Sequence, residues 1–337
     1  MNPHRGPGIV VIASTAALAL LYLTAAAAPF VAPYDYTEQN RSFPHCPPSP
    51  LHLNAPTRWT ESVLYTYGYE LVDPITRRYE LQTAHRVPVR LFHDGHLFTT
   101  PDGAPKFFLL GTDGLGRDLF SRIIHGGRIS LTIGLVGVAI SFTLGTLVGS
   151  FVGYIGGWVD NLTMRLVEVE MSLPSFYFLL ALAAVIPSWI SSSLRFLLIV
   201  AIMSLINWAG FARIIRGMVS SLREGEYVLA ARALGASRWR IVTRHLIPGT
   251  FGYTIVAATL AIPGFILGES ALSLLGLGIQ EPGASWGNLL AEAQNVQNLT
   301  KYPWILVPGL FIFVTIMAFN FLGDYLRERL DPRAAAR

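Results

Sequence analysis

The feature that most constrains this chain is a series of apolar stretches, each long enough to cross a lipid bilayer. A transmembrane helix needs about 20 mostly apolar residues, and six stretches of the sequence meet this requirement. Soluble domains carry about 25% charged residues, whereas this chain carries 14% and has a mean hydropathy of +0.46. The sequence therefore predicts an all-α polytopic membrane protein. The six predicted spans are 8–32, 129–155, 162–187, 194–217, 250–275 and 303–323.

The first apolar stretch has two interpretations. It follows Arg5 and ends near the sequence TAAAAP, and this combination is also typical of a cleavable signal peptide. Its apolar run is longer than the usual core of a signal peptide, so we expect a retained N-terminal transmembrane helix over 1–32. Cleavage would leave the other five spans oriented as before.

The positions of the arginines predict the orientation of the spans, because short positively charged loops stay in the cytoplasm. The segment 213–245 contains seven arginines against two glutamates, and the tail 326–337 contains four arginines. The loop 276–302 has a single positive residue, Lys301. We therefore expect both termini in the cytoplasm and the segment 33–110 outside. The net charge of +4 follows from arginines that flank apolar runs, so we expect no nucleic-acid partner.

The segment 33–110 differs in composition from the rest of the chain. Nine prolines occur between 36 and 110, and the stretch VPVRLFHDGHLFTT turns at Asp94-Gly95, as a β-hairpin does. We expect a small outer insertion that contains β-strands. The single cysteine, Cys46, excludes an intrachain disulfide and a cysteine-based zinc cluster. We interpret the histidines of this segment as surface residues, with no metal site: His45, His52, His85, His93 and His96.

The segment 111–128, GTDGLGRDLFSRIIHGGR, is expected to form an amphipathic lead-in helix at the membrane surface. Thr112 or Asp113 can cap the start of a helix. Apolar residues then recur on one face, ahead of the second span. These apolar residues are Leu119, Phe120, Ile123 and Ile124.

Two kinds of residue stand out inside the predicted spans. Gly145, Gly149 and Gly153 are four residues apart, which predicts a flat face against which another helix packs. Ionisable side chains in spans are costly and often functional. Arg165 and Glu168 are three residues apart and can pair on one helix face. We expect a structural pair or a contact beside a gate, with a proton relay as the alternative. For Glu269, lining the translocation path and hydrogen bonding to neighbouring hydroxyls are equally supported.

The stretch EYVLAARALGAS interrupts the apolar pattern between the fourth and fifth spans. Glu226 to Leu234 are expected to form a short helix, which ends where Gly235 takes a left-handed conformation. A second helix is expected from about Ser237 to Ile247, with Pro248 as its end. Two alanines on one face of the first helix have small side chains, so that face forms only a shallow apolar ridge. A shallow ridge of this kind fits a groove of another protein.

Three sequence segments resemble one family. EYVLAARALGASRWRIVTRHLIP resembles the EAA loop of ABC-importer permeases, and the preceding NWAGFARIIRGMVSSLREGEY fits the group that imports peptides, nickel and some oligosaccharides. GTDGLGRDLFSRIIHGGRISLTIGL and LGESALSLLGLGIQEPGASWGNLL are similar to two further segments of that group. The resemblance covers about 111–330. It implies a C-type permease subunit of an oligopeptide/dipeptide importer in the bacterial inner membrane, with the type I ABC-importer permease fold.

The resemblance also implies roles for the parts of the chain. The insertion 33–110 would be periplasmic, and 129–325 would form the permease core, with a cytoplasmic coupling elbow at 221–248. The partners would be two ATP-binding subunits, a second homologous permease and a periplasmic or lipid-anchored solute-binding protein. Leu229 departs from the family pattern, because an acidic residue is common at this position. The residues expected to contact the ATP-binding subunit are Glu226, Tyr227, Ala230, Ala231, Arg232, Leu234, Gly235 and Ala236.

Three other functions are less consistent with the sequence: an ATPase, an intramembrane hydrolase and a stand-alone secondary transporter. No P-loop surrounds either lysine, Lys106 or Lys301, so ATP and Mg are expected on partner subunits, and this chain is expected to bind no cofactor and to carry no catalytic residue. An intramembrane hydrolase could use Ser270, but no histidine lies within a predicted span to act as its base. A stand-alone secondary transporter would need internal repeats, and none is evident. Peptides are the expected substrate, with nickel and oligosaccharides as alternatives.

Overall fold

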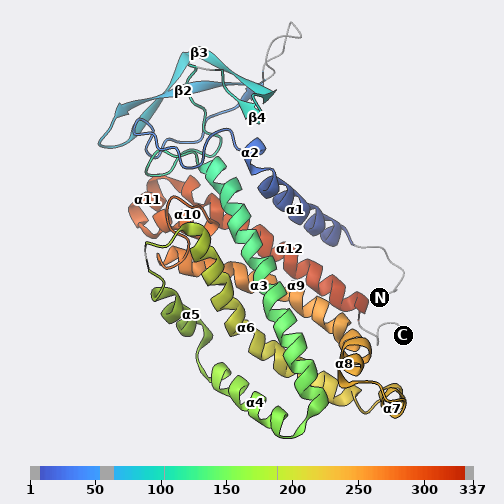
Figure 1. The fold of residues 1–337 in the computed structure, drawn as a ribbon. Coiled ribbons are helices and arrows are strands. Elements are labelled where there is room, and N and C mark those ends of the chain that lie inside the picture. The colour runs from blue at the N-terminus through green and yellow to red at the C-terminus, as the bar shows by residue number, and fades with distance from the viewer. Residues whose placement is uncertain (1–7, 54–63, 102, 188, 331–337) are drawn as a thin grey trace. The chain divides into compact units, whose positions relative to one another are not determined.

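The computed structural model describes residues 8–53, 64–101, 103–187 and 189–330 (Figure 1). Arg5 of the signal-like segment, and Arg333 and Arg337 of the tail, lie outside the described residues. Within them, five helical runs are long and apolar enough to cross a membrane, and a bent helix pair can supply a sixth span. This confirms the predicted all-α polytopic membrane protein. The five runs are Ile9–Ala26 (helix α1), Leu119–Ile155 (α3), Ser192–Leu222 (α6), Arg238–Leu274 (α8 through α9) and Pro303–Leu330, which includes α12 (Val307–Leu330).

The third predicted span is two helices joined at a sharp bend. Helix α4 (Gly157–Ser172) and helix α5 (Ser175–Ala184) meet at an angle of 81°. Leu173, between them, is extended, with φ −81° and ψ 131°. The cause is Pro174, because a proline disfavours helical backbone at the residue before it and has no N–H to donate.

Helix α3 (Leu119–Ile155) begins later than the predicted lead-in helix and runs without a break into the second span. The predicted start at Thr112 or Asp113 is wrong. Asp118 lies directly before the helix, where its Oδ2 accepts a hydrogen bond of 2.7 Å from the Ser121 N–H. The apolar stripe of the lead-in is mostly buried and includes Leu119 and Ile123.

Helix α8 (Arg238–Ile241) continues through a π-helical turn, Val242–Leu246, into helix α9 (Ile247–Leu274). The predicted helix end at Pro248 is therefore wrong. Proline cannot donate a backbone hydrogen bond, and a π turn changes the hydrogen-bond register where that donor is missing.

The outer insertion contains one antiparallel sheet with strand order β1-β2-β3-β4. His93 pairs with His96, and the two residues between them, Asp94 and Gly95, have φ values of 51° and 77°. These values define the tight turn that such a hairpin requires, so the predicted hairpin is confirmed. The strands are β1 (His52–Leu53), β2 (Leu64–Asp73), β3 (Arg78–His93) and β4 (His96–Thr99).

The chain forms two compact units. One comprises Thr132–Glu269 with segments from both ends of the chain, and the other comprises Ala19–Leu131 and Ser270–Phe313. The second unit holds the sheet and a buried tryptophan, Trp286, whose indole Nε1 donates a hydrogen bond of 2.9 Å to the Ile123 carbonyl. Its short helices are α2 (Ala28–Val31), α10 (Trp286–Leu289), α11 (Val296–Lys301) and the 3-10 turns Leu290–Gln294 and Pro303–Leu306.

Candidate functional site

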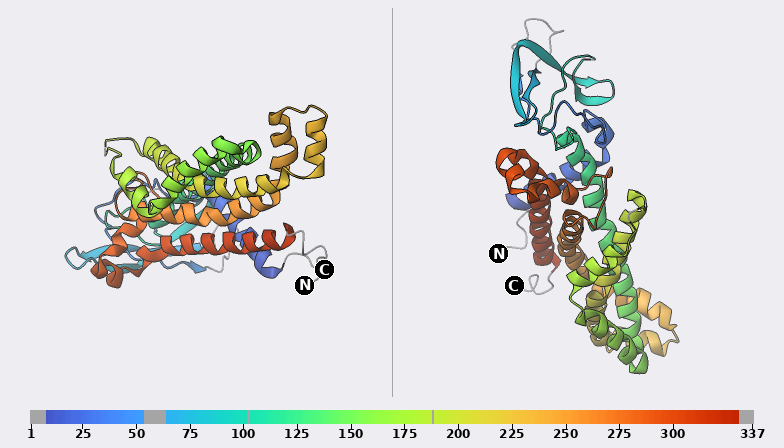
Figure 2. Two further views of the ribbon diagram at one scale, coloured as in Figure 1. Left: turned by 90° about the horizontal axis from the view of Figure 1, so that it is seen from below. Right: turned by 90° about the vertical axis from the view of Figure 1, so that its left-hand side faces the viewer.

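The interruption between the fourth and fifth spans is a helical elbow, defined here as helices α7 (Glu226–Ala233) and α8 with the turn between them. Two views show the elbow projecting beyond the end of α6 (Ser192–Leu222) (Figure 2). Gly235 ends α7 with φ 77°, and the Ala236 N–H donates to the Ala231 carbonyl at 3.1 Å. This is the Schellman arrangement, in which a glycine takes a left-handed conformation that other residues adopt at a cost.

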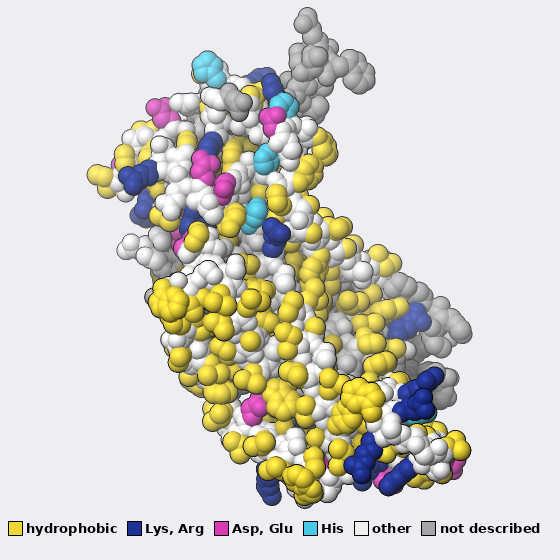
Figure 3. Space-filling model, in the orientation of Figure 1, with side chains coloured by type: hydrophobic (Ala, Val, Ile, Leu, Met, Phe, Trp, Pro, Cys, Tyr) yellow, Lys and Arg dark blue, Asp and Glu magenta, His cyan; other side chains and the backbone are white. Residues whose placement is uncertain are grey.

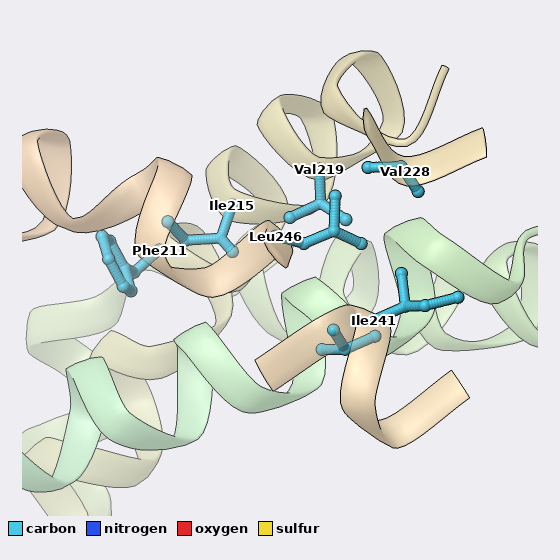
Figure 4. Packing of buried hydrophobic residues seen from close by; sticks show 7 residues of the cluster. Phe211, Ile215, Val219, Val228, Ile241 and Leu246 are labelled. Atoms are coloured by element: carbon cyan, nitrogen blue, oxygen red, sulfur yellow. The ribbon is translucent and has the colours of Figure 1, made fainter. Parts of the chain in front are cut away.

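A buried hydrophobic cluster anchors the elbow to α6 and to the start of α9 (Figure 4). Val228 is the α7 member and is 1% exposed, while Ile241 comes from α8 and Leu246 from the π-helical turn that follows it. Ala231 and Ala236 pack against the same cluster. The elbow is therefore held by apolar packing on its inner side. The full cluster is Phe211, Ile215, Val219, Val228, Ile241, Val242 and Leu246.

The outer side of the elbow exposes large apolar residues. Leu234 is 88% exposed, and Tyr227, Leu229 and Trp239 are also exposed. Lys and Arg side chains gather around this end of the first unit, and hydrophobic side chains cover the face over α3 to α6 (Figure 3). Of the predicted contact residues, Glu226, Tyr227, Ala230, Arg232, Leu234 and Gly235 are exposed, whereas Ala231 and Ala236 are half-buried and pack inward.

The three glycines of the second span lie against the backbone of α6. A Cβ atom on Gly149 would lie 2.4 Å from the Ala212 carbonyl oxygen, and one on Gly153 would lie 2.7 Å from the Arg216 carbonyl oxygen. A Cβ atom on Gly145 would lie 2.8 Å from the Phe211 ring. Real side chains do not approach this closely, so α3 and α6 can take this spacing only with glycine at these positions.

One ion pair connects α4 with α6, and a second lies within α4. The Arg216 Nε donates to Asp160 Oδ1 at 2.8 Å, and its Nη2 donates to Asp160 Oδ2. On α4 itself, Arg165 Nη1 donates to Glu168 Oε2 at 3.1 Å, as the spacing of three residues predicts. Glu168 is exposed and lies on the wall of a cavity between the two helices.

The second predicted intramembrane carboxylate, Glu269, is fully buried in α9. Beside it, the Ser270 hydroxyl forms no hydrogen bond with any described residue. The base that a hydrolase would require is thus not in contact with this serine. Among the described residues, no group of three or more His, Cys, Asp or Glu side chains has the geometry to hold a metal ion.

A charged cluster in the second unit was missed by the sequence reasoning. Arg117 and Arg122 are both buried, and both donate to the carboxylate of Glu281: Arg117 Nη1 at 2.5 Å from Oε2 and Arg122 Nη2 at 2.9 Å from Oε1. Asp113 accepts from Arg117 Nε at 2.6 Å on the inner side. The cluster ties the segment before α3 to the loop after α9. We refer to Asp113, Arg117, Arg122 and Glu281 as the outer charged cluster.

The protonation of the acids around this cluster follows from their surroundings. Burial raises the pKa of Glu281, but the hydrogen bonds and charges of Arg117 and Arg122 outweigh burial and lower the pKa overall. For Glu292, burial and the charge of Asp113 prevail, and the pKa is raised. Burial lowers the pKa of His45 to about 4, so its contact of 3.9 Å with Glu292 is not an ion pair at neutral pH.

Two family profiles match the chain. Residues 145–336 match the family described as binding-protein-dependent transport system inner membrane component, and residues 10–48 match the N-terminal TM domain of oligopeptide transport permease C. A solved structure of an amino acid ABC transporter covers 62% of this chain and 94% of its own, with 17% identity and a TM-score of 0.44.

Several relatives are similar over most of the chain. The oligopeptide transport system permease protein OppC of Haemophilus influenzae is 44% identical over 241 residues, 71% of this chain and 75% of that protein. The dipeptide transport system permease protein DppC of Bacillus subtilis is 40% identical over 69% of this chain and 70% of that protein. The glutathione transport system permease protein GsiD of Pectobacterium atrosepticum is 37% identical over 69% of this chain and 75% of that protein.

The family match and the relatives place this polytopic chain, with its glycine-packed spans and projecting elbow, in the class of membrane permeases. More particularly, the chain belongs to the family of binding-protein-dependent transport system inner membrane components, the permeases of ABC importers. The resemblance drawn from the elbow, the segment before the second span and the end of the fifth span is confirmed. As a member of this family, the chain is a transport component of the inner membrane.

Proposed function

We propose that this chain forms half of the inward translocation path of an ATP-driven peptide importer. The observation that carries the proposal is the elbow, a rigidly anchored helix pair that exposes Tyr227, Leu229 and Leu234 outside the apolar spans. Exposed apolar side chains on a fixed helix suit a groove in a partner protein. Similarity to relatives named for oligopeptide, dipeptide and glutathione transport supports peptides as the substrate class.

The partners follow from what the elbow would do. Two ATP-binding subunits would each hold an elbow, one from this chain and one from a second homologous permease. ATP and Mg would bind those subunits. Closure of the subunits on ATP would push the elbows and rock the packed spans between outward- and inward-open states. A periplasmic or lipid-anchored solute-binding protein would deliver the peptide outside, with both termini of this chain in the cytoplasm.

The buried cluster explains how force would pass from the elbow to the spans. Val228 lies in one cluster with Ile215 and Val219 of α6 and with Leu246 before α9. A push on α7 would therefore act on two spans at once, because close-packed interiors transmit displacement. The glycine contacts pass the same motion from α6 to α3.

Two carboxylates are proposed for the translocation machinery. Glu269 is buried in α9, and we place it beside the path. Glu168, paired with Arg165 at the edge of the α4–α6 cavity, would be a contact beside the inner gate. Their substitution by glutamine should change the rate of peptide uptake and leave the elbow's association with ATP-binding subunits intact.

The test of coupling uses Leu234, which is 88% exposed and contributes no core packing. In proteoliposomes with all partner subunits, Leu234→Glu should reduce ATP-dependent uptake of a labelled peptide about tenfold or more, as expected for a central interface residue. The ATP-binding subunits should also co-purify less well. Ile75→Glu is the matched control, because Ile75 is 94% exposed and lies in the turn between β2 and β3 of the outer insertion. Unchanged uptake and co-purification in Leu234→Glu would disprove the coupling role.

The substrate class is tested separately by competition. Unlabelled di- and oligopeptides should displace the labelled peptide, while Ni²⁺ and oligosaccharides should not. Competition by Ni²⁺ or by an oligosaccharide alone would assign the importer to that alternative and leave the coupling role standing.

A further inference from the structure

A polar cavity of about 260 Å³ lies between α4 and α6, near the end of α6 that leads to the elbow. One face of α4 and one face of α6 supply its walls, because the lining positions recur at intervals of three and four residues. The ion pair between Asp160 and Arg216 joins the two helices beside it. The lining residues are Asn161, Met164, Arg165, Glu168, Arg213 and Arg216.

The charges of this cavity favour an anion. Three arginines line it together with one carboxylate, Glu168, and a second carboxylate, Asp160, lies beside it as the partner of Arg216. Arg165 is paired with Glu168, and Arg216 with Asp160. Arg213 forms no hydrogen bond or ion pair with any other described residue. Its guanidinium therefore has all five N–H donors available, in the planar geometry that suits a phosphate group.

The surface beside the cavity favours an amphiphile. Leu162, Leu166 and Val169 are exposed, and each follows a residue that lines the cavity, so an apolar stripe lies next to the polar wall on α4. Trp158, in the first turn of α4, is also exposed. Tryptophan is enriched where the hydrocarbon meets the headgroups. A ligand with a charged phosphate and a hydrocarbon tail matches both surfaces.

We propose that the α4–α6 cavity binds the phosphate headgroup of an anionic phospholipid from the cytoplasmic leaflet. Arg213 would bind the phosphate oxygens, Arg216 would add its remaining N–H groups, and the Asn161 amide would hydrogen bond to the headgroup. The acyl chains would lie along Leu162 and Leu166. Basic pockets between spans on the cytoplasmic side are known to hold such headgroups. The choice of leaflet rests on the proposed orientation of the chain.

The proposal is tested by lipid binding to the purified full chain. Native mass spectrometry would compare retention of dimyristoyl phosphatidylglycerol with retention of dimyristoyl phosphatidylcholine, and inorganic phosphate would be added as a competitor. Phosphatidylglycerol should bind about five- to tenfold more tightly than phosphatidylcholine, in line with the contribution of one arginine near a headgroup. Arg213→Gln should abolish this preference, while Arg213→Lys should keep part of it. Arg327→Gln, at an exposed arginine on α12, is the matched control and should change nothing.

Each other outcome would overturn the proposal. Equal retention of both lipids would indicate non-specific annular lipid, and full displacement by millimolar phosphate would indicate a site for free phosphate. An undiminished preference in Arg213→Gln would place the lipid elsewhere. The thermal unfolding midpoint of each variant without lipid shows whether it is folded. Because the assay needs neither ATP nor a partner, its result is independent of the test of peptide uptake.

Discussion

Gly149 shows how one absent side chain fixes the distance between two spans. Its position on α3 leaves no room for a methyl group, because a Cβ atom would lie 2.4 Å from the Ala212 carbonyl oxygen. Backbone cannot move away as a flexible side chain can. Gly149→Ala should therefore lower the free energy of unfolding by about 1–3 kcal/mol, the usual cost of overpacking. The measurement is the thermal unfolding midpoint of the purified chain.

Gly217 provides the matched control for this substitution. It lies in α6, and a Cβ atom there would meet no atom within 4 Å. Gly217→Ala should be neutral or should stabilise the helix by up to about 1 kcal/mol, because alanine loses less backbone entropy than glycine. A Gly149→Ala variant as stable as Gly217→Ala would contradict the close approach of α3 and α6.

Glu281 is the residue through which the outer charged cluster should respond to pH. Glu281→Gln removes the carboxylate that two buried arginines share, and it should destabilise the chain by about 1–2 kcal/mol at neutral pH. We expect a destabilisation at the lower end of what hydrogen bonds to charged groups contribute, because the Glu281 side chain is 53% exposed and solvent screens its charge. The measurement is again the thermal unfolding midpoint, with Glu80→Gln as control, because the Arg78–Glu80 pair is fully at the surface.

The sign of the pH dependence follows from the lowered pKa of Glu281. A carboxylate with a lowered folded pKa stabilises the fold fully above its unfolded pKa of about 4.3, and that contribution is lost as the pH falls through the folded pKa. The difference between the native chain and Glu281→Gln should therefore shrink as the pH is lowered below about 4. Glu292 has a raised pKa and works in the opposite direction, but it is present in both proteins. A constant difference down to pH 3 would contradict the role of the carboxylate.

At the scale of elements, the elbow depends on how α7 ends. Gly235 has φ 77°, a value that proline cannot reach and that asparagine tolerates. Gly235→Pro should displace α8 and abolish ATP-dependent uptake, whereas Gly235→Asn should retain most of it. Both variants should reach the membrane at normal levels, as measured by immunoblot of membrane fractions. Normal uptake in Gly235→Pro would show that the angle of the elbow does not matter for transport.

The elements that the sequence predicted well are those governed by near neighbours. The end of α7 at Gly235 and the turn at Asp94-Gly95 each follow from the conformational freedom of one glycine. The start of α3 was mistaken because Thr112 and Asp113 have the side chains of helix caps but use them elsewhere. Thr112 Oγ1 accepts from the Cys46 N–H at 2.7 Å, a contact between residues far apart in the chain.

In the candidate site, too, features set by near neighbours could be predicted and contacts between distant residues could not. The exposed face of the elbow could be predicted from helical spacing. Ala231 and Ala236 nevertheless pack inward, because the cluster is assembled from three separate stretches of the chain. The outer charged cluster could not be found in this way, since Arg117 and Glu281 are 164 residues apart and neither lies in a recognisable local pattern. Its only signal was that both arginines and the glutamate fall within segments that resemble the family.

At the scale of the whole molecule, the orientation of the chain decides whether the elbow can meet ATP and whether the α4–α6 cavity faces the cytoplasmic leaflet. The single cysteine, Cys46, makes a direct test simple. In a Cys46→Ser background, one new cysteine would be placed at Ile75 in the sheet unit or at Leu229 in the elbow, both of which are exposed. A membrane-impermeant maleimide would then be added to intact spheroplasts and to lysed ones.

The arginine distribution predicts opposite results for these two positions. Ile75→Cys should be labelled in intact spheroplasts, because the sheet is predicted to lie outside. Leu229→Cys should be labelled only after lysis, because the seven arginines of the segment 213–245 predict a cytoplasmic location. Labelling of Leu229→Cys from outside would separate the elbow from cytoplasmic ATP-binding subunits and end the coupling proposal. It would also move the phospholipid site to the outer leaflet, while the preference of Arg213 for an anionic headgroup would still be measured independently.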